Sequence, residues 1–429
     1  MTRLLKRSLV LAVLSALPAT ALATNGMFMI GYSVKSVGMG GVAMAFPQDS
    51  MVSAVNPAGI SEIGTRFDAE ATLFLPSAQA SLGGVNSKSR ANEYLLPGLG
   101  LNMQLDNETS FNFSMVGAGG GGSHYKQNFY DISANPPNGT GNPHTGDLGV
   151  DLMVMQMNPT MSQKINDNNT LGATLVLSVA RFKAFGLGNF TQFTSSQTDT
   201  SLTDRGPEYS RGMGMRFGWL GKLPNMGLTL GAAATSKIYM TKFQNYSELF
   251  AEQGDMDTPA NLGAGFALKF TPKATIAMDV IRTYYSKVRS IANTGPNLPG
   301  DPNGLFPTSK AENGLGEDAG LGFGWHDQTV YKLGVNYVYN SKWTYRAGWN
   351  YGKSPINSSH DIAFNIVAPA TTQHHATLGT TYKLDKQTEV NFAYMHAFPF
   401  EQSGPTYIGN SGTIKMSQDS FGIGVGFFF

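Results

Sequence analysis

Four basic residues stand where they could bind the carboxylate of a ligand. Three of them fall at alternating positions of predicted β-strands, so their side chains would share one interior, and the fourth lies in a glycine-rich N-terminal segment. A cation in an otherwise apolar trough binds one carboxylate through charge-assisted hydrogen bonds. The alternative for each is an ion pair with an interior acid such as Asp279. Lys332 ranks first because it lies near the middle of its strand. The candidates are Lys332, Lys35, Arg216 and Arg346.

Residue types for catalysis or metal binding do not gather in the sequence. His374 and His375 are adjacent, so their side chains would point to opposite faces of a strand and could not share a metal ion. The glycine-rich run 38–41 lacks the strand-to-helix context of a nucleotide-binding loop. The chain has no cysteine for thiol chemistry. We therefore expect no enzyme, no metal and no cofactor.

The first residues predict export. Three basic residues precede an apolar stretch, 8–17, and small residues follow it. This pattern is typical of a secretory signal peptide, 1–23, with cleavage between Ala23 and Thr24. A transmembrane anchor is the alternative, but it needs roughly 20 apolar residues. This run is shorter, and Pro18 interrupts it.

The composition favours a membrane barrel over soluble domains. Charged residues make up 14% of the chain, against about 25% in a typical soluble domain, while Gly counts 51 and aromatic residues reach 11%. After the signal, no apolar run is long enough for a transmembrane helix. Hydrophobicity hidden by alternation with polar residues is typical of membrane-spanning β-strands. The net charge of +1 gives no electrostatic case for a nucleic-acid partner.

Alternation of apolar and polar residues recurs from residue 67 to the C terminus, in about fourteen segments. Short turns and long polar loops, such as 117–151 and 182–208, alternate between these segments. This is typical of outer-membrane barrels, with short periplasmic turns and long outer loops. The last segment, 421–429, ends on phenylalanine, which resembles the signal read by barrel-assembly machinery. We predict an all-β protein, a transmembrane antiparallel β-barrel of about 14 strands over residues 67–429, in the bacterial outer membrane.

Residues 24–66 show no sustained strand pattern and predict a plug, or hatch, inside the barrel. A fourteen-strand lumen is wide enough to pass small polar solutes unless something fills it. The segment resembles a known family, the FadL/OmpP1/TodX outer-membrane transporters of long-chain fatty acids and hydrocarbons. The resemblance rests on a glycine-rich run, an Asn-Pro-Ala triplet and the strand count. The motif residues are Gly38, Gly40, Gly41, Asn56, Pro57 and Ala58.

The resemblance implies a hatch inside the barrel and a third strand that kinks inward to open a side exit toward the bilayer. A glycine run after Val116 is the candidate for this kink, because glycine inside a strand marks bulges and bends. The same glycines could instead begin the next outer loop. The kink residues are Gly117, Gly119 and Gly120.

By the same analogy, the mature N terminus would line an inner apolar site and the long outer loops would form a capture groove. Methionine, which counts 20, suits promiscuous apolar binding. Local packing is the alternative for all of these residues. The inner residues are Met27, Phe28, Met29 and Ile30, and the outer residues are Phe129, Tyr130, Phe185, Phe190 and Phe193.

The preferred function is passive uptake of long-chain fatty acids. Uptake of aromatic or aliphatic hydrocarbons is the alternative within the family, and it would need no cation for a carboxylate. A general porin or a surface receptor or adhesin is the alternative from another class. The expected partners are hydrophobic small molecules, outer-membrane lipid or lipopolysaccharide, and the barrel-assembly machinery, with the protein itself a monomer.

Overall fold

The structure is a computed structural model, and it describes residues 25–130, 146–194, 196, 201–294, 314–357, 362–405 and 411–429. The predicted signal peptide and its cleavage site between Ala23 and Thr24 lie outside these residues. No helix in the described part of the chain is long and apolar enough to cross a membrane.

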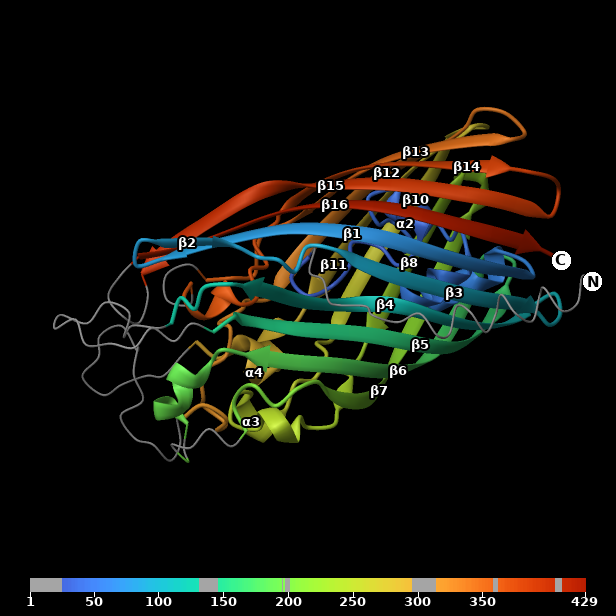
Figure 1. The fold of residues 1–429 in the computed structure, drawn as a ribbon. Coiled ribbons are helices and arrows are strands. Elements are labelled where there is room, and N and C mark those ends of the chain that lie inside the picture. The colour runs from blue at the N-terminus through green and yellow to red at the C-terminus, as the bar shows by residue number, and fades with distance from the viewer. Residues whose placement is uncertain are drawn as a thin grey trace, which may run out of the picture.

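Fourteen long antiparallel strands form a closed barrel, as the sequence predicted (Figure 1). Each strand pairs with the next long strand along the chain, and β16 pairs with β1 to close the ring. Two short strands, β2 (Val85–Lys88) and β9 (Tyr239–Met240), extend the sheet at β1 and β7. The fourteen are β1 (Arg66–Leu82), β3 (Tyr94–Gln104), β4 (Thr109–Tyr125), β5 (Leu148–Asn166), β6 (Asn169–Phe185), β7 (Glu208–Leu223), β8 (Leu228–Thr235), β10 (Asn261–Thr271), β11 (Ala274–Thr283), β12 (Gln328–Val338), β13 (Trp343–Gly352), β14 (His374–Lys383), β15 (Thr388–Pro405) and β16 (Ser411–Phe428).

All helices of the described residues are short, and they lie before β1 or in the connections between strands. Before β1 these are the α-helix α2 (Val34–Val37) and the 3-10 helices η1 (Ser50–Ala54) and η2 (Pro57–Glu62). The connections hold η4 (Gly188–Phe193), η5 (Pro224–Met226), η6 (Gln244–Tyr246), α3 (Ala251–Gly254), η7 (Tyr285–Lys287), α4 (Arg289–Ala292) and η8 (Phe364–Ile366).

Short turns and long connections alternate along the chain, as predicted. Short turns join strands at the end of the barrel where the C terminus lies, and longer connections leave the opposite end (Figure 1). Two outer loops begin later than the alternation indicated, because β4 continues to Tyr125 and β6 to Phe185. Pairing with β5 holds both extensions in the sheet, although their glycine-rich or charged sequences lack the apolar face that marks a membrane strand.

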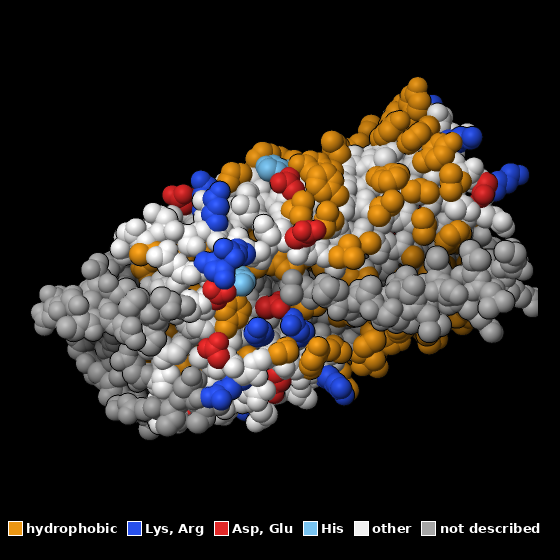
Figure 2. All heavy atoms as spheres, in the orientation of Figure 1, with side chains coloured by type: hydrophobic (Ala, Val, Ile, Leu, Met, Phe, Trp, Pro, Cys, Tyr) orange, Lys and Arg blue, Asp and Glu red, His pale blue; other side chains and the backbone are white. Residues whose placement is uncertain are grey.

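An apolar belt with aromatic edges surrounds the barrel wall (Figure 2). Near the short turns, the rings of Trp343 and Tyr382 lie 4.5 Å apart, and near the outer edge Tyr351 lies 4.6 Å from His374. Between these two levels Leu378 stands opposite Ala347 and is 60% exposed. Aromatic girdles on either side of an aliphatic band mark the two membrane interfaces of such barrels.

The position of this belt predicts that a charged substitution on the outer face lowers the free energy of unfolding more near the bilayer midplane than near its edge. Leu378→Arg is expected to lower the free energy of unfolding in lipid vesicles by about 2–4 kcal/mol, since it places a cation near the bilayer midplane. Leu384→Arg is the matched control, because Leu384 is 53% exposed just beyond the turn end of β14 and should cost about 0–1 kcal/mol. Equal costs for the two variants in a guanidinium titration would contradict this placement of the belt.

Candidate functional site

Residues 25–65, which we call the hatch, hydrogen-bond to inward-facing side chains on most sides of the barrel. Its partners lie on β1, β3, β4, β7, β11, β12, β13, β14 and β15. Local caps shape it, because Ser33 forms a capping box at α2 and Asp49 and Asn56 cap η1 and η2. This hydrogen bonding compensates the polar backbone of a segment that has little regular structure.

The glycines of the predicted hatch motif allow close backbone contact with the barrel wall. Gly40 has a φ of +72° and Gly41 one of +85°, a region that glycine adopts without strain. On the wall, a Cβ added to Gly348 would lie 2.1 Å from the backbone nitrogen of Gly40. A Cβ added to Gly38 would lie 2.8 Å from the Cα of Gly379. Glycines on both partners therefore let the hatch lie directly against β13 and β14.

The Asn-Pro-Ala triplet joins the hatch to β7. The Asn56 amide donates to the backbone oxygens of Met44, at 2.7 Å, and Trp219, at 3.0 Å. Its oxygen accepts from the backbone of Ala58 at 3.1 Å, and Pro57 begins η2. One buried side chain thus ties together two parts of the hatch and one strand.

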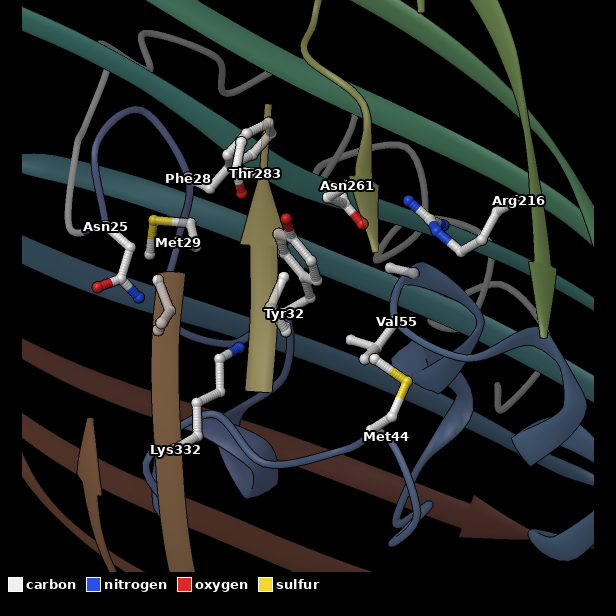
Figure 3. Close-up of a pocket in the computed structure, with 13 residues that line it drawn as sticks. Asn25, Phe28, Met29, Tyr32, Met44, Val55, Arg216, Asn261, Thr283 and Lys332 are labelled. Carbon is white, nitrogen blue, oxygen red and sulfur yellow. The ribbon is translucent and has the colours of Figure 1, made fainter. Parts of the chain in front are cut away.

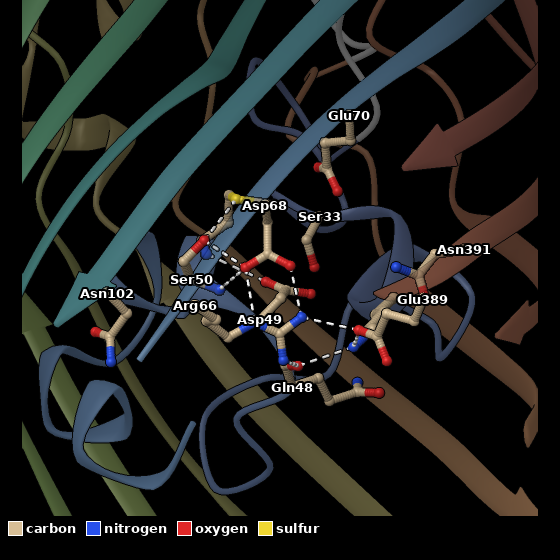
Figure 4. Close-up of polar contacts among 12 residues, drawn as sticks. Ser33, Gln48, Asp49, Ser50, Arg66, Asp68, Glu70, Asn102, Glu389 and Asn391 are labelled. Carbon is tan, nitrogen blue, oxygen red and sulfur yellow. Dashed lines mark hydrogen bonds and ion pairs between the residues drawn. The ribbon is translucent and has the colours of Figure 1, made fainter. Parts of the chain in front are cut away.

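A buried ionic network, which we call the latch, fastens the hatch to β1 and β15 (Figure 4). Lys35 on α2 pairs with Glu389, and the same carboxylate accepts from Arg66 at 2.8 Å. Arg66 also pairs with Asp68 at 2.5 Å. These four side chains are at most 6% exposed. Of the four, only Lys35 is among the residues predicted from the sequence. The missed signal was the charge at inward positions near the turn ends of two strands.

Electrostatics make Glu389 the central member of the latch. Burial lowers the pKa of the Lys35 ammonium, as does the nearby Arg66, whereas Glu389 acts in the opposite direction. Two cations thus share one carboxylate in a site with little water. Removing that carboxylate would leave both cations without this partner, which is costly in a buried site.

The other three predicted cations also contact the hatch. Lys332 donates to the backbone oxygens of Ile30, at 2.8 Å, and Gly41, at 3.3 Å. Arg216 donates to the backbone oxygen of Ser53 at 3.0 Å. Arg346 donates to the Gln48 side chain at 2.6 Å and to Thr381 at 2.7 Å. Alternation predicted that these side chains share one interior, and each of them holds a part of the hatch there.

A cavity lies between the hatch and the wall, with about 570 Å³ of space free of protein atoms (Figure 3). Its lining is mixed, since Lys332, Arg216, Asn25, Asn261 and Thr283 line it together with apolar side chains. Tyr32 projects into the middle of this group in Figure 3. Of the four predicted inner residues, Phe28 and Met29 line the cavity, while Met27 and Ile30 are buried beside it. The apolar lining residues are Phe28, Met29, Tyr32, Met44, Ala54, Val55, Ile281 and Val330.

Four of the five predicted outer aromatics join a buried cluster above this cavity. The rings of Tyr130 and Phe190 lie 4.8 Å apart, Phe193 lies 6.0 Å from Phe190, and Phe129 contacts Tyr125 at 5.1 Å. The cluster continues into a later loop, since Phe190 contacts Phe364 at 5.8 Å.

Phe185 does not reach this cluster. On β6, Phe182 and Ala184 are buried in the interior, so Phe185 turns to the outer face. There it lies 5.1 Å from the His124 ring and 5.3 Å from the Lys183 ammonium. The predicted loop position explains the difference, because Phe185 is the last residue of a strand rather than part of the loop.

The hydrogen-bonded wall of the barrel is interrupted between β3 and β4. Of the two, β4 is the third long strand of the barrel. Pairing of these strands ends at Gly98 and Val116, and the pairing of β4 with β5 shifts register between Gly117 and Gly119. β4 nevertheless continues to Tyr125, so these glycines lie within a strand and do not begin a loop. Hydrogen bonding resumes higher up, where the backbone of Arg90 donates to that of His124 at 2.7 Å.

The start of the hatch occupies this gap. The Gly120 backbone nitrogen donates to Met27 at 2.8 Å, and Phe28 forms a β-bridge with Gly119. A Cβ at Gly119 would lie 2.1 Å from the Met27 oxygen, so only glycine permits this approach. Residues 25–29 therefore supply backbone partners to the edge of β4 that β3 leaves open.

Comparison with known families identifies the chain. The model of the outer-membrane transport proteins OMPP1/FadL/TodX matches residues 15–404. The chain belongs to the OMPP1/FadL/TodX family. It is thus an outer-membrane β-barrel of a family that transports hydrophobic compounds.

Solved members of similar fold cover nearly the whole chain. The toluene transporter TodX of Pseudomonas putida shares 21% identity at a TM-score of 0.69, covering 95% of this chain and 100% of that chain. A FadL homologue of Pseudomonas aeruginosa shares 14% at a TM-score of 0.67, covering 94% and 100%. The toluene transporter TbuX of Ralstonia pickettii shares 17% at a TM-score of 0.64, covering 93% and 99%. A comparison with curated protein sequences finds no match.

Proposed function

We propose that this OMPP1/FadL/TodX family member takes up long-chain fatty acids passively across the outer membrane. The observation that carries the proposal is the pair of cations, Arg216 and Lys332, at a cavity that apolar side chains line together with Asn25, Asn261 and Thr283. Among the ion pairs of the described residues, none joins either cation to a carboxylate. A buried cation whose hydrogen bonds all go to neutral oxygens favours an anionic ligand.

The charge around the cavity supports one bound carboxylate. Asp279 stands opposite Lys332 in the pairing of β11 with β12. One of its oxygens accepts from the backbones of Ala43, at 2.8 Å, and Met44, at 3.0 Å, so this acid is engaged by the hatch. Two cations and one acid leave a single positive charge.

A route for the ligand runs from the outer aromatic cluster to the cavity and then through the gap beside β4. Leaving through the wall would deliver an apolar chain into the bilayer without a passage through the polar lower lumen. In this route residues 25–29 must leave the gap before the ligand can pass. We propose that binding displaces them.

Uptake of aromatic hydrocarbons is the second candidate. Lys332 and Arg216 already donate to hatch carbonyls, so both could serve the hatch alone and leave the cavity to an uncharged ligand. TodX and TbuX, of similar fold, are described as toluene transporters, and CymD as a monoaromatic hydrocarbon channel. A general porin would instead pass sugars, which liposome swelling measures directly. A receptor or adhesin would lose partner binding, but not hydrophobic uptake, when its outer loops are deleted.

The test compares uptake of labelled oleate and labelled toluene by cells with and without the gene, and with Lys332→Met. We expect the variant to lower oleate uptake about tenfold or more, because a charge-assisted hydrogen bond contributes about 1.5–3 kcal/mol. Toluene uptake should stay unchanged.

The control is Lys342→Met, which removes an exposed lysine at the turn between β12 and β13. Equal loss of both substrates in Lys332→Met would assign this lysine to the hatch alone. Loss of toluene uptake only, in cells without the gene, would favour the hydrocarbon candidate. No change for either substrate would reject hydrophobic transport as the function of this chain.

Biogenesis is a further proposal. We propose that the barrel-assembly machinery recognises the last strand, β16, whose outward side chains are apolar near Phe429 and whose inward positions 422, 424 and 426 are glycines.

A further inference from the structure

The outer face of the barrel carries a polar groove where β2, β1, β16 and β15 lie side by side. Two rows of outward side chains cross these four strands in register. The first row runs Lys88, Gln79, Lys415 and Glu401. The second row runs Asn86, Ser81, Thr413 and Ser403. All but Ser403 line the groove.

The groove stands just above the apolar belt. Outward positions of β1 are apolar up to Leu75, and those of β16 up to Phe421, which is 50% exposed. Gln79 lies four residues beyond Leu75, which on a tilted strand is about 10 Å higher. The acid between the two levels, Asp419, is already bound by Tyr394 at 2.7 Å and His396 at 2.9 Å. A ligand in the groove would therefore lie at the height of lipid head groups, on the outer side of the membrane.

The chemistry of the groove suits a phosphorylated sugar. Lys88 and Lys415 are two strands apart, about 10 Å, and the Gln79 amide lies between them. Hydroxyl and amide groups of the second row match sugar hydroxyls. Lys415 is 3.7 Å from Glu401, but both side chains are about half exposed, and such surface pairs are weak. The exposed Arg90, two residues beyond Lys88, adds a further positive charge. Figure 2 shows basic side chains, with acids among them, gathered in the band between the apolar surface and the grey loops.

We infer that this groove binds the phosphorylated saccharide head group of an outer-leaflet glycolipid, whose acyl chains lie against the apolar belt below. A soluble sugar phosphate would satisfy the groove alone. An amphiphile satisfies both the groove and the adjoining apolar surface, which is why the lipid is the occupant. The site lies on the outside of the wall, so it is independent of the transported compound.

The test is native mass spectrometry of the full-length mature protein in a zwitterionic detergent, titrated with bis-phosphorylated lipid A. Lys88→Gln combined with Lys415→Gln should weaken binding about 25-fold, since each cation near an anionic lipid surface contributes about a factor of five. Glu401→Gln should tighten binding several-fold, because it removes the acid from the groove. The matched control is Lys383→Gln combined with Lys386→Gln, which removes two exposed lysines at the opposite end of the barrel.

Thermal melting by circular dichroism confirms that each variant is folded. An equal loss in the control pair, or an unchanged affinity in the groove pair, would overturn the inference. Dephosphorylated lipid A should bind weakly and without dependence on the two lysines. If phosphatidylglycerol bound as tightly as lipid A with the same dependence, the site would be a general anionic-lipid site and the saccharide assignment would fail.

Discussion

Oxidising a Met29→Cys, Ala118→Cys double variant is expected to lower uptake of the hydrophobic substrate at least tenfold, and a reductant should restore it. Met29 donates its backbone N–H to Ala118 at 3.5 Å, next to the bridge between Phe28 and Gly119. Residues opposite each other in such a pair have Cβ atoms about 4.5–5.5 Å apart, so a small shift suffices for a disulfide. The bond would hold residues 25–29 in the gap beside β4, through which the proposed route leaves the barrel.

The chain suits this experiment because it has no native cysteine. Each single cysteine variant, oxidised in the same way, is the control for the substitutions themselves. Full uptake by the cross-linked protein, with the disulfide verified on a gel, would show that the ligand leaves by another path or without movement of the N terminus.

Glu389→Ala is expected to release the hatch from the barrel wall. The substitution leaves Lys35 and Arg66 buried near one another without the carboxylate that they share. Breaking a buried pair in this way costs about 3–5 kcal/mol. We expect that much loss in the free energy of unfolding, together with a strong rise in sucrose entry into liposomes that contain the variant. Denaturant titration and liposome swelling measure the two effects.

Glu401→Ala is the control, because it removes a half-exposed acid that pairs with Lys415 outside the barrel. Its expected effect on stability is about 0–1 kcal/mol, with no change in swelling. If Glu389→Ala lost stability but stayed closed to sucrose, the latch would stabilise the hatch without controlling the lumen.

The barrel strands could be predicted from the sequence because a membrane wall imposes a local rule. One face of each strand meets lipid and the other meets the interior, so apolar and polar residues alternate over a few neighbours. The barrel was predicted to begin at residue 67, and its first strand begins at Arg66. Above the membrane the outer face no longer meets lipid, so alternation predicted loops for the outer half of β4 and for the last four residues of β6.

The same local rule placed the candidate cations on the interior face but could not supply their partners. Alternation determines which way Lys332 and Arg216 point. It does not show that the carbonyls of Ile30 and Ser53 accept hydrogen bonds from them. The hatch has no repeating hydrophobic pattern, and its backbone conformation depends on helix caps and on close contacts at glycines. The latch shows the same limit, since Glu389 lies 354 residues from Lys35 along the chain.

Patterns among neighbouring residues were enough to predict the class of this protein, an antiparallel membrane barrel with a separate N-terminal segment. The contacts across the barrel depend on the three-dimensional fold. Closure of β16 on β1 brings Lys415 next to Gln79 and so within two strands of Lys88, and it creates the outer groove. The backbone of β4 at the gap is likewise hydrogen-bonded only because residues 25–29 lie against it. Alternation orients side chains strand by strand, whereas these contacts depend on chain closure and on packing over long sequence distances.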